Sequence, residues 1–168
     1  MSALELSTPP LGVIACLAEP DALERLETPV GALALRVAPD ERNLWCRAHE
    51  RERVLAAVRE AALAADPTAL VADVSAGWSA RLLAGAGARA AFATQVAFDP
   101  GQEGTRFLQG AVHGVSARSL VGEDFALVLL VAPAACTFDR YRPAAWGPVG
   151  EPDGALLDRI LASAPVAA

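Results

Sequence analysis

Three strand-like segments follow one another closely in the second half of the chain. Arg106–Val112 and Val115–Val121 are joined around Gly114, and Phe125–Val131 follows after another short connection. Connections this short join antiparallel neighbours, because parallel strands need a crossover of about a dozen residues or more. The pattern therefore predicts a hairpin and a third antiparallel strand, and the unbroken apolar run of the third strand indicates burial.

The first half of the chain mixes strand and helix signals. Ala32–Val37 and Leu44–Ala48 flank a turn at Pro39–Asn43 and predict a second hairpin. Residues 50–65 place their apolar side chains mostly on one side of a 3.6-residue period, which predicts a helix. Further strands are expected at Ala69–Ser75 and Trp78–Ala84, and further helices at residues 85–94 and 134–141.

Hairpins mixed with helices predict an α+β fold, with a mainly antiparallel sheet and helices packed on one face. Prolines at positions 9, 10, 20 and 29 indicate irregular structure before the first hairpin. We therefore expect three parts: an extended N-terminal arm over residues 1–30, an α+β domain over residues 31–141, and an irregular tail over residues 142–168 with a short C-terminal helix at Asp153–Leu161.

All fourteen positive charges are arginine, and the chain contains no lysine. Schiff-base chemistry, a phosphate-loop lysine and a lysine general base are therefore excluded for this polypeptide. The net charge of −6 opposes the nucleic-acid backbone and anionic lipid surfaces, so we expect neither nucleic acid nor membrane as a partner. The longest apolar run, Phe125–Ala132, is also far shorter than the roughly 20 residues of a membrane-spanning helix.

The three cysteines are Cys16, Cys46 and Cys136, and they are widely separated. An odd number without a C-x-x-C pair suggests neither a disulfide framework nor a zinc site. The short apolar stretch Leu11–Ala18 follows two prolines and no basic residue, unlike a secretory signal. A cytoplasmic location is the simplest interpretation.

Several local patterns admit both a chemical and a structural interpretation. Residues 85–90 match the relaxed G-x-G-x-x-A form of a dinucleotide-binding turn, but the helix after them is short and a tight strand-to-helix turn is favoured. Cys46 precedes Arg47, which can activate a thiol, although a small buried hydrophobe is the commoner role. Asp73 is a lone carboxylate among apolar residues, and it suits either catalysis or, more commonly, acceptance of backbone N–H bonds in a turn. For the two histidines, His49 and His113, we expect surface positions and no metal.

The centre of the chain resembles a sequence block of a known protein superfamily. The stretches Ala72–Trp78 (ADVSAGW) and Arg81–Arg89 (RLLAGAGAR) resemble the D-x-S … L-x-G-x-x-A block of the glycine-cleavage aminomethyltransferase superfamily. Within that superfamily, the chain is most similar to the gamma subunits of heterotetrameric sarcosine oxidases, over about residues 31–140. The resemblance implies a fold like the aminomethyltransferase N-terminal domain.

The resemblance also implies a function. A gamma-like chain would be a non-catalytic accessory subunit of a complex that oxidatively demethylates sarcosine to glycine. Its partners would be the larger alpha and beta flavoprotein subunits and a small delta subunit, and FAD, FMN, NAD and tetrahydrofolate would be bound in those subunits. No catalytic residue and no metal ligand of its own is expected, and the chain lacks the K-G-C-Y-x-G-Q motif of related folate proteins.

Two other functions are compatible with the sequence. The chain could be a stand-alone folate-binding one-carbon module, with Asp73 and an arginine such as Arg81 or Arg106 as the folate ligands, because arginine recognises carboxylates well. It could also be an adaptor for an unrelated oxidoreductase, because a fold does not determine a function.

Overall fold

A computed structural model describes residues 4–163 and divides them into two compact units. The first unit holds residues 4–9 and 77–157, and the second holds residues 10–76 and 158–163. Each unit contains one sheet, with six strands in the first and four in the second. All but one of the strand pairs are antiparallel, which confirms the α+β class with mainly antiparallel pairing.

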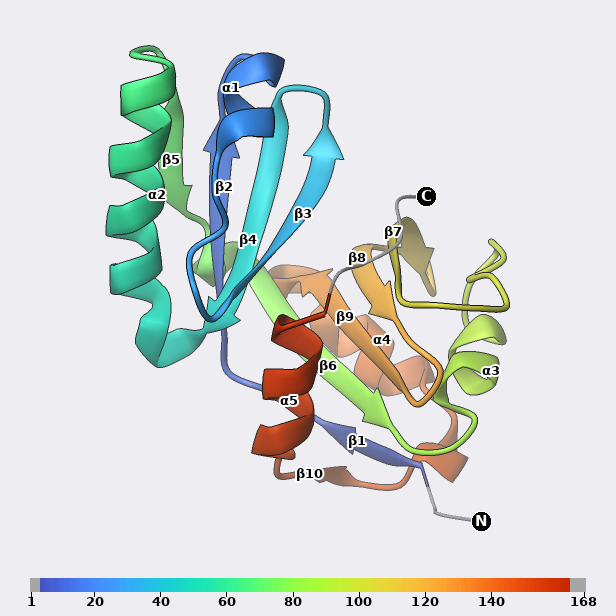
Figure 1. The fold of residues 1–168 in the computed structure, drawn as a ribbon. Helices are drawn as coiled ribbons and strands as arrows, with labels where there is room; N and C mark the ends of the chain where they lie inside the picture. Colours follow the sequence, from blue (N-terminus) through green and yellow to red (C-terminus); the bar gives the residue numbers. More distant parts are fainter. Residues whose placement is uncertain (1–3, 164–168) are drawn as a thin grey trace. The chain divides into compact units, whose positions relative to one another are not determined.

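The sheet of the first unit has the order β10-β1-β6-β9-β8-β7, and only the outer pair β1–β10 is parallel (Figure 1). Its strands are β1 (Glu5–Ser7), β6 (Trp78–Ala84), β7 (Arg106–Val112), β8 (Val115–Val121), β9 (Phe125–Val131) and β10 (Val149–Gly150). The hairpin expected around Gly114 is confirmed, with Val112 opposite Val115. Its two turn residues, His113 and Gly114, have φ values of 50° and 76°, as a type I′ turn requires.

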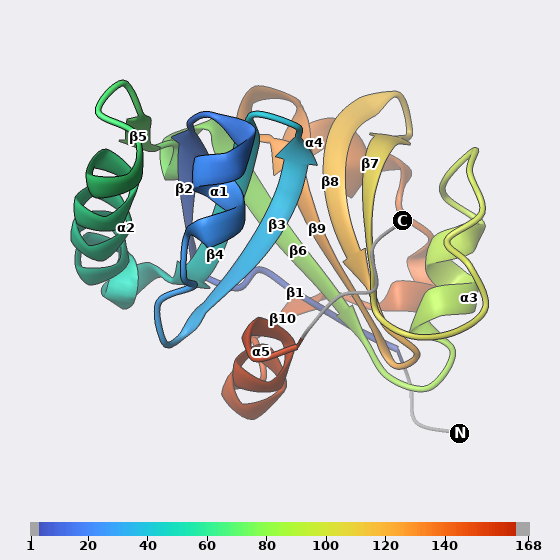
Figure 2. The same ribbon diagram turned by 45° about the horizontal axis from the view of Figure 1, so that its top comes forward.

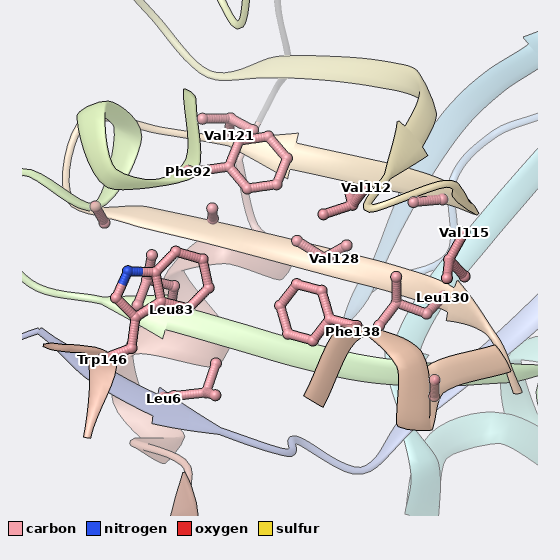
Figure 3. Packing of buried hydrophobic residues seen from close by; sticks show 14 residues of the cluster. Leu6, Leu83, Phe92, Val112, Val115, Val121, Val128, Leu130, Phe138 and Trp146 are labelled. Atoms are coloured by element: carbon pink, nitrogen blue, oxygen red, sulfur yellow. The ribbon is translucent and has the colours of Figure 1, made fainter. Parts of the chain in front are cut away.

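Two helices cover one face of this sheet, α3 (Ala88–Ala93) and α4 (Ala135–Tyr141). Phe92 of α3 and Phe138 of α4 are each only 1% exposed and belong to one apolar cluster with Leu83, Val128 and Leu130. Figure 3 shows these rings lying against the strands, with Phe92 next to Val121. Each such aromatic removes a large apolar area from water, so the two short helices are held mainly by their rings.

The sheet of the second unit has the order β3-β4-β2-β5, and every pair is antiparallel. Its strands are β2 (Leu11–Leu17), β3 (Ala32–Ala38), β4 (Glu41–Arg47) and β5 (Leu70–Asp73). The hairpin expected from residues 32–48 is confirmed as β3–β4, and the helix expected over residues 50–65 is confirmed as α2 (Arg51–Ala65). Figure 1 shows α2 running alongside β5 and β2.

One face of the second sheet is covered by α2 and by the short helix α1 (Pro20–Arg25). Val54, Val58 and Ala62 of α2 are buried in one cluster with Ile14 and Leu44 of the sheet. The helix positions follow the i, i+4, i+8 spacing of a single apolar stripe, which is why this segment forms an amphipathic helix.

The extended arm expected over residues 1–30 is wrong for most of its length. Residues 5–7 form β1, residues 11–17 form a central strand, and residues 20–25 form α1. The prolines lie between the elements: Pro9 and Pro10 separate β1 from β2, and Pro20 begins α1, where a missing N–H costs nothing. Residues 1–3 of the expected arm lie outside the described residues.

The expected single domain over residues 31–141 and the irregular tail also need correction. The chain forms two units, and each draws on residues from beyond those bounds. Within the tail, Trp146 is buried in the first unit's core at 3% exposure, and β10 pairs with β1. The C-terminal helix is confirmed as α5 (Gly154–Leu161), while residues 164–168 lie outside the described part.

Candidate functional site

Asp73 ends β5, where it closes a turn. Its Oδ1 accepts a hydrogen bond from the backbone N–H of Ser75 at 2.9 Å and another from the Ser75 hydroxyl at 2.6 Å. The Ser75 Oγ in turn accepts the backbone N–H of Val13 at 2.9 Å. The expected role of Asp73 as an acceptor for nearby backbone N–H groups is therefore confirmed.

A cation also engages the Asp73 carboxylate. Arg51, at the start of α2, places its Nε 3.0 Å from Oδ2. Burial acts to raise the pKa of Asp73, but the two hydrogen bonds from Ser75 and the charge of Arg51 outweigh burial, and the net pKa lies below its ordinary value. Asp73 is thus an ionised structural anchor that links β5, β2 and α2, and both of its oxygens already have partners.

Arg81 lies on β6 of the first unit, and its side chain is only 9% exposed. Its Nε and Nη2 donate to the two carboxylate oxygens of Asp139 on α4, at 2.8 Å and 2.6 Å. Its Nη1 donates to the Ser79 hydroxyl and to the Ala80 carbonyl. The bidentate pair with Asp139 holds α4 on the sheet. Together, the four hydrogen bonds engage all three nitrogens of the guanidinium.

Arg106 begins β7, at the opposite edge of the sheet from β10. Its Nε donates weakly to the Glu103 carbonyl at 3.4 Å, and its guanidinium covers Gly101, where a Cβ would approach Nε to 2.6 Å. Two strands, β9 and β8, separate β6 from β7, so Arg106 and Arg81 are not brought together. Asp73 belongs to the other unit. Folate binding by these three residues stays a prediction.

A cavity of about 690 Å³ opens beside α3 in the first unit. It is lined by Gly87 and three residues of α3, by the loop 99–104 and by Glu123. Arg89 in its wall donates to the carbonyls of Gly101, Gly104 and Gly122. Its guanidinium therefore stabilises the loop. With three carboxylates also in the wall (Asp99, Glu103 and Glu123), the cavity favours a neutral or cationic occupant over a carboxylate-bearing one.

The other residues that the sequence offered as chemical candidates have structural positions. Cys46 is fully buried, and burial raises the pKa of its thiol to about 11, so it is the small core hydrophobe expected from the sequence. Gly85 and Gly87 have φ values of 119° and 85°, and they form the tight turn from β6 into α3. His49 is exposed as expected, whereas His113 is half-buried with its ring 6.2 Å from that of Phe138.

Within residues 4–163, no group of three or more His, Cys, Asp or Glu side chains is placed to hold a metal ion. In the same range no helix combines the length and apolar character needed to cross a membrane.

Comparison with known proteins extends the sequence resemblance to the fold. A chain of the heterotetrameric sarcosine oxidase from Corynebacterium sp. U-96 superposes with a TM-score of 0.64, at 16% identity, over 97% of this chain and 87% of that one. The glycine-cleavage aminomethyltransferase T from Bartonella henselae gives a TM-score of 0.65 at 12% identity. The chain has the fold of these proteins.

The extent of each match differs. The superposition on aminomethyltransferase T covers 83% of this chain but only 45% of that protein. The regulatory subunit of aspartate kinase from Thermus thermophilus also superposes, with a TM-score of 0.51 and 12% identity, over 86% of this chain and 98% of that one. No family model and no curated protein sequence matches the chain.

Three residues with structural roles escaped the sequence analysis: Arg51, Arg89 and Asp139. Each acts on a partner that is at least 12 positions away in the sequence; Asp139 lies 58 positions from Arg81. Arg89 ends the block that carries the family resemblance, and this position is the only signal that could have singled it out.

Proposed function

We propose that this chain is an accessory subunit of a flavin-dependent complex related to heterotetrameric sarcosine oxidase. The observation that carries the proposal is the extent of the match: a chain of that enzyme superposes over 97% of this one and is itself covered to 87%. Two chains of nearly the same length and fold suit the same place in an assembly, whereas aminomethyltransferase T has more than half of its length unmatched.

The local chemistry of the candidate residues supports a structural role. The Asp73 carboxylate is engaged by Ser75 and Arg51, and the Arg81 guanidinium by Asp139, Ser79 and Ala80. Recruiting the buried Arg81 guanidinium for catalysis would leave buried polar groups unsatisfied, at a cost of about 1–3 kcal/mol each. Recruiting Asp73 would break its turn with Ser75 and its ion pair with Arg51. These side chains therefore stabilise the fold that the complex would use.

In this proposal the redox chemistry belongs to the partners. FAD, FMN and NAD, together with tetrahydrofolate, would be bound by the larger alpha and beta subunits, with a small delta subunit completing the complex. This chain would contribute contact surface and stabilise its partner by mass action, because only a folded partner binds it. The complex would reside in the cytoplasm, where the free thiols Cys16, Cys46 and Cys136 stay reduced.

Affinity purification of the full chain from its native cells tests the proposal. A C-terminally tagged chain should bring down a protein with flavin absorbance, and the eluate should release hydrogen peroxide from sarcosine, while the chain expressed alone should do neither. The same tag on an unrelated protein is the control. Elution of the chain without a flavoprotein, at native expression levels, would refute the proposed role.

A stand-alone folate-binding module is the second candidate, favoured by the TM-score of 0.65 with aminomethyltransferase T. Calorimetric titration of the isolated chain with tetrahydrofolate distinguishes the two candidates. Binding that weakens in Arg106→Gln but not in Arg25→Gln, a change at an exposed arginine of the other unit, would support the folate-binding module; no heat at millimolar ligand would eliminate it.

A further inference from the structure

Two arginines face each other across the β3–β4 hairpin of the second unit. Arg36 and Arg42 are register partners, and Cys16 of β2 is the partner of Arg42 on its other side. Register partners project from the same face of an antiparallel sheet with their Cβ atoms about 5 Å apart. Like charges directly opposite each other destabilise a sheet, so this arrangement calls for negative charge nearby.

The compensation inside the chain is incomplete. Glu24 of α1 lies 3.4 Å from Arg36 Nη2, but its side chain is 71% exposed. Arg42 Nη1 donates to the Leu26 carbonyl at 2.7 Å, which satisfies the N–H but brings no charge. Within residues 4–163, Arg36 Nη1 is buried and has no hydrogen-bond partner. A buried charged donor without an acceptor is costly, which makes this atom the exception that needs an explanation.

Buried neighbours reduce the solvent screening of the charges on Arg36 and Arg42. Cys16, the register partner of Arg42, and Leu26, whose carbonyl accepts from Arg42, are both buried. Figure 2 shows α1 lying beside β4 at this end of the sheet. Burial is the first cause that lowers the pKa of Arg42, the charge of Arg36 is the second, and Glu24 only partly opposes them. Solvent reaches part of the Arg36 side chain, which is 34% exposed, although its Nη1 is buried.

We infer that Arg36 and Arg42 form a binding site for a small oxyanion, a phosphate or carboxylate group. Guanidinium groups present planar forks of N–H donors that match both groups. A shift of the Arg36 side chain that brought its buried Nη1–H to the oxyanion would supply the acceptor that this atom lacks. The ligand would also remove the repulsion between the two cations. The site depends on the second unit alone, and it holds whether or not the chain belongs to a flavin-dependent complex.

Titration of the full chain by NMR tests the site. The arginine Nε–Hε signals are followed during addition of sodium phosphate, and separately of sodium acetate, at constant ionic strength maintained with sodium chloride. We expect saturable shifts of the Arg36 and Arg42 signals with at least one anion. Saturation by phosphate identifies a phosphate group as the preferred ligand, and saturation by acetate alone identifies a carboxylate.

Matched variants separate a built site from general attraction. Arg36→Gln should weaken binding at least tenfold, and Arg36→Lys, which keeps the charge but loses the fork, should weaken it less. Arg25→Gln removes an exposed charge from neighbouring α1 and should leave the affinity within twofold. If neither anion saturates in the unmodified chain, or if Arg25→Gln weakens binding as much as Arg36→Gln, the inference is overturned. Circular dichroism confirms that each variant is folded.

Discussion

Arg81 and Asp139 form a two-pronged ion pair that fastens helix α4 to strand β6, with Nε–Oδ1 and Nη2–Oδ2 distances of 2.8 Å and 2.6 Å. The Arg81 side chain is 9% exposed and the Asp139 side chain 36%, so the pair lies at the margin of the core. Removing one partner from such a pair leaves the other charge buried, which costs more than the intact pair contributes. This asymmetry makes the pair a sensitive place to test the fold.

Asp139→Asn should lower the free energy of unfolding by about 2 kcal/mol, less than for a fully buried pair because solvent screens the partly exposed carboxylate. Urea unfolding followed by circular dichroism measures the change. Asp158→Asn is the control, since Asp158 is 68% exposed in its pair with Arg47 and should cost under about 1 kcal/mol. Equal losses in the two variants would contradict the special position of the Arg81–Asp139 pair.

The same pair gives the protein an acid-sensitive component of stability. Hydrogen bonds from Arg81 are the main cause that lowers the pKa of Asp139, burial opposes them, and the charges of Arg81 and Arg142 add to the lowering. Because the folded pKa lies below the unfolded value of about 3.9, the unfolded chain binds more protons in this range. The stabilisation is therefore complete above about pH 5 and falls as the pH drops through the folded pKa.

Thermal unfolding between about pH 2 and pH 7 measures this effect. The difference in melting temperature between the unmodified chain and Asp139→Asn should be constant near neutrality and should shrink below about pH 4. A difference that grows on acidification would have the wrong sign for a carboxyl with a lowered pKa.

Thiol alkylation distinguishes the three cysteines. Cys136 is exposed, whereas Cys16 and Cys46 are fully buried, and burial raises the pKa of both thiols. Iodoacetamide should therefore add one group to the native protein and three after unfolding in urea, because the reactive form is the exposed thiolate. Mass spectrometry of peptides identifies the modified residue; rapid native labelling of Cys46 would show that β4 does not bury it.

Gly12 is a position where a methyl group has no room. A Cβ there would lie 2.9 Å from Cys46 Sγ and 3.1 Å from Arg51 Cβ. Gly12→Ala should therefore destabilise the protein by roughly 1–3 kcal/mol through overpacking. Gly77→Ala is the matched control, because nothing lies within 4 Å of its added Cβ, and its effect should stay within about 0.5 kcal/mol. Chemical denaturation of both variants gives the comparison.

Local patterns predicted the elements that local physics determines. The hairpin β7–β8 and the strand β9 appear with the expected bounds, because an alternating or apolar run between turn residues leaves few other conformations. Over residues 1–30 the prolines predict irregular structure, whereas in the structure they mark boundaries between regular elements. The proline-free run Leu11–Leu17 is in fact an interior strand of its sheet.

The side-chain partnerships were beyond local reasoning. Asp73 was recognised as a turn acceptor because its main partner, Ser75, lies two residues away. Its other partner, Arg51, comes from a separate element, and such pairings depend on how the helix and strands pack. The opposition of Arg36 and Arg42 could have been found only from the exact hairpin register, since shifting the register by one residue would move one arginine to the other face.

The order of the strands along the chain has a consequence for biosynthesis. All four strands of the second unit lie within residues 11–73, so this sheet can assemble while the ribosome is still translating the rest of the message. The first unit's sheet begins with β1 near the N-terminus and is completed only by β10 at Val149–Gly150. β1 can pair with β6 once residue 84 has emerged, but its other edge has no partner until β10 is made. A nascent chain stalled before residue 149 would present this unpaired edge to chaperones and to other nascent chains.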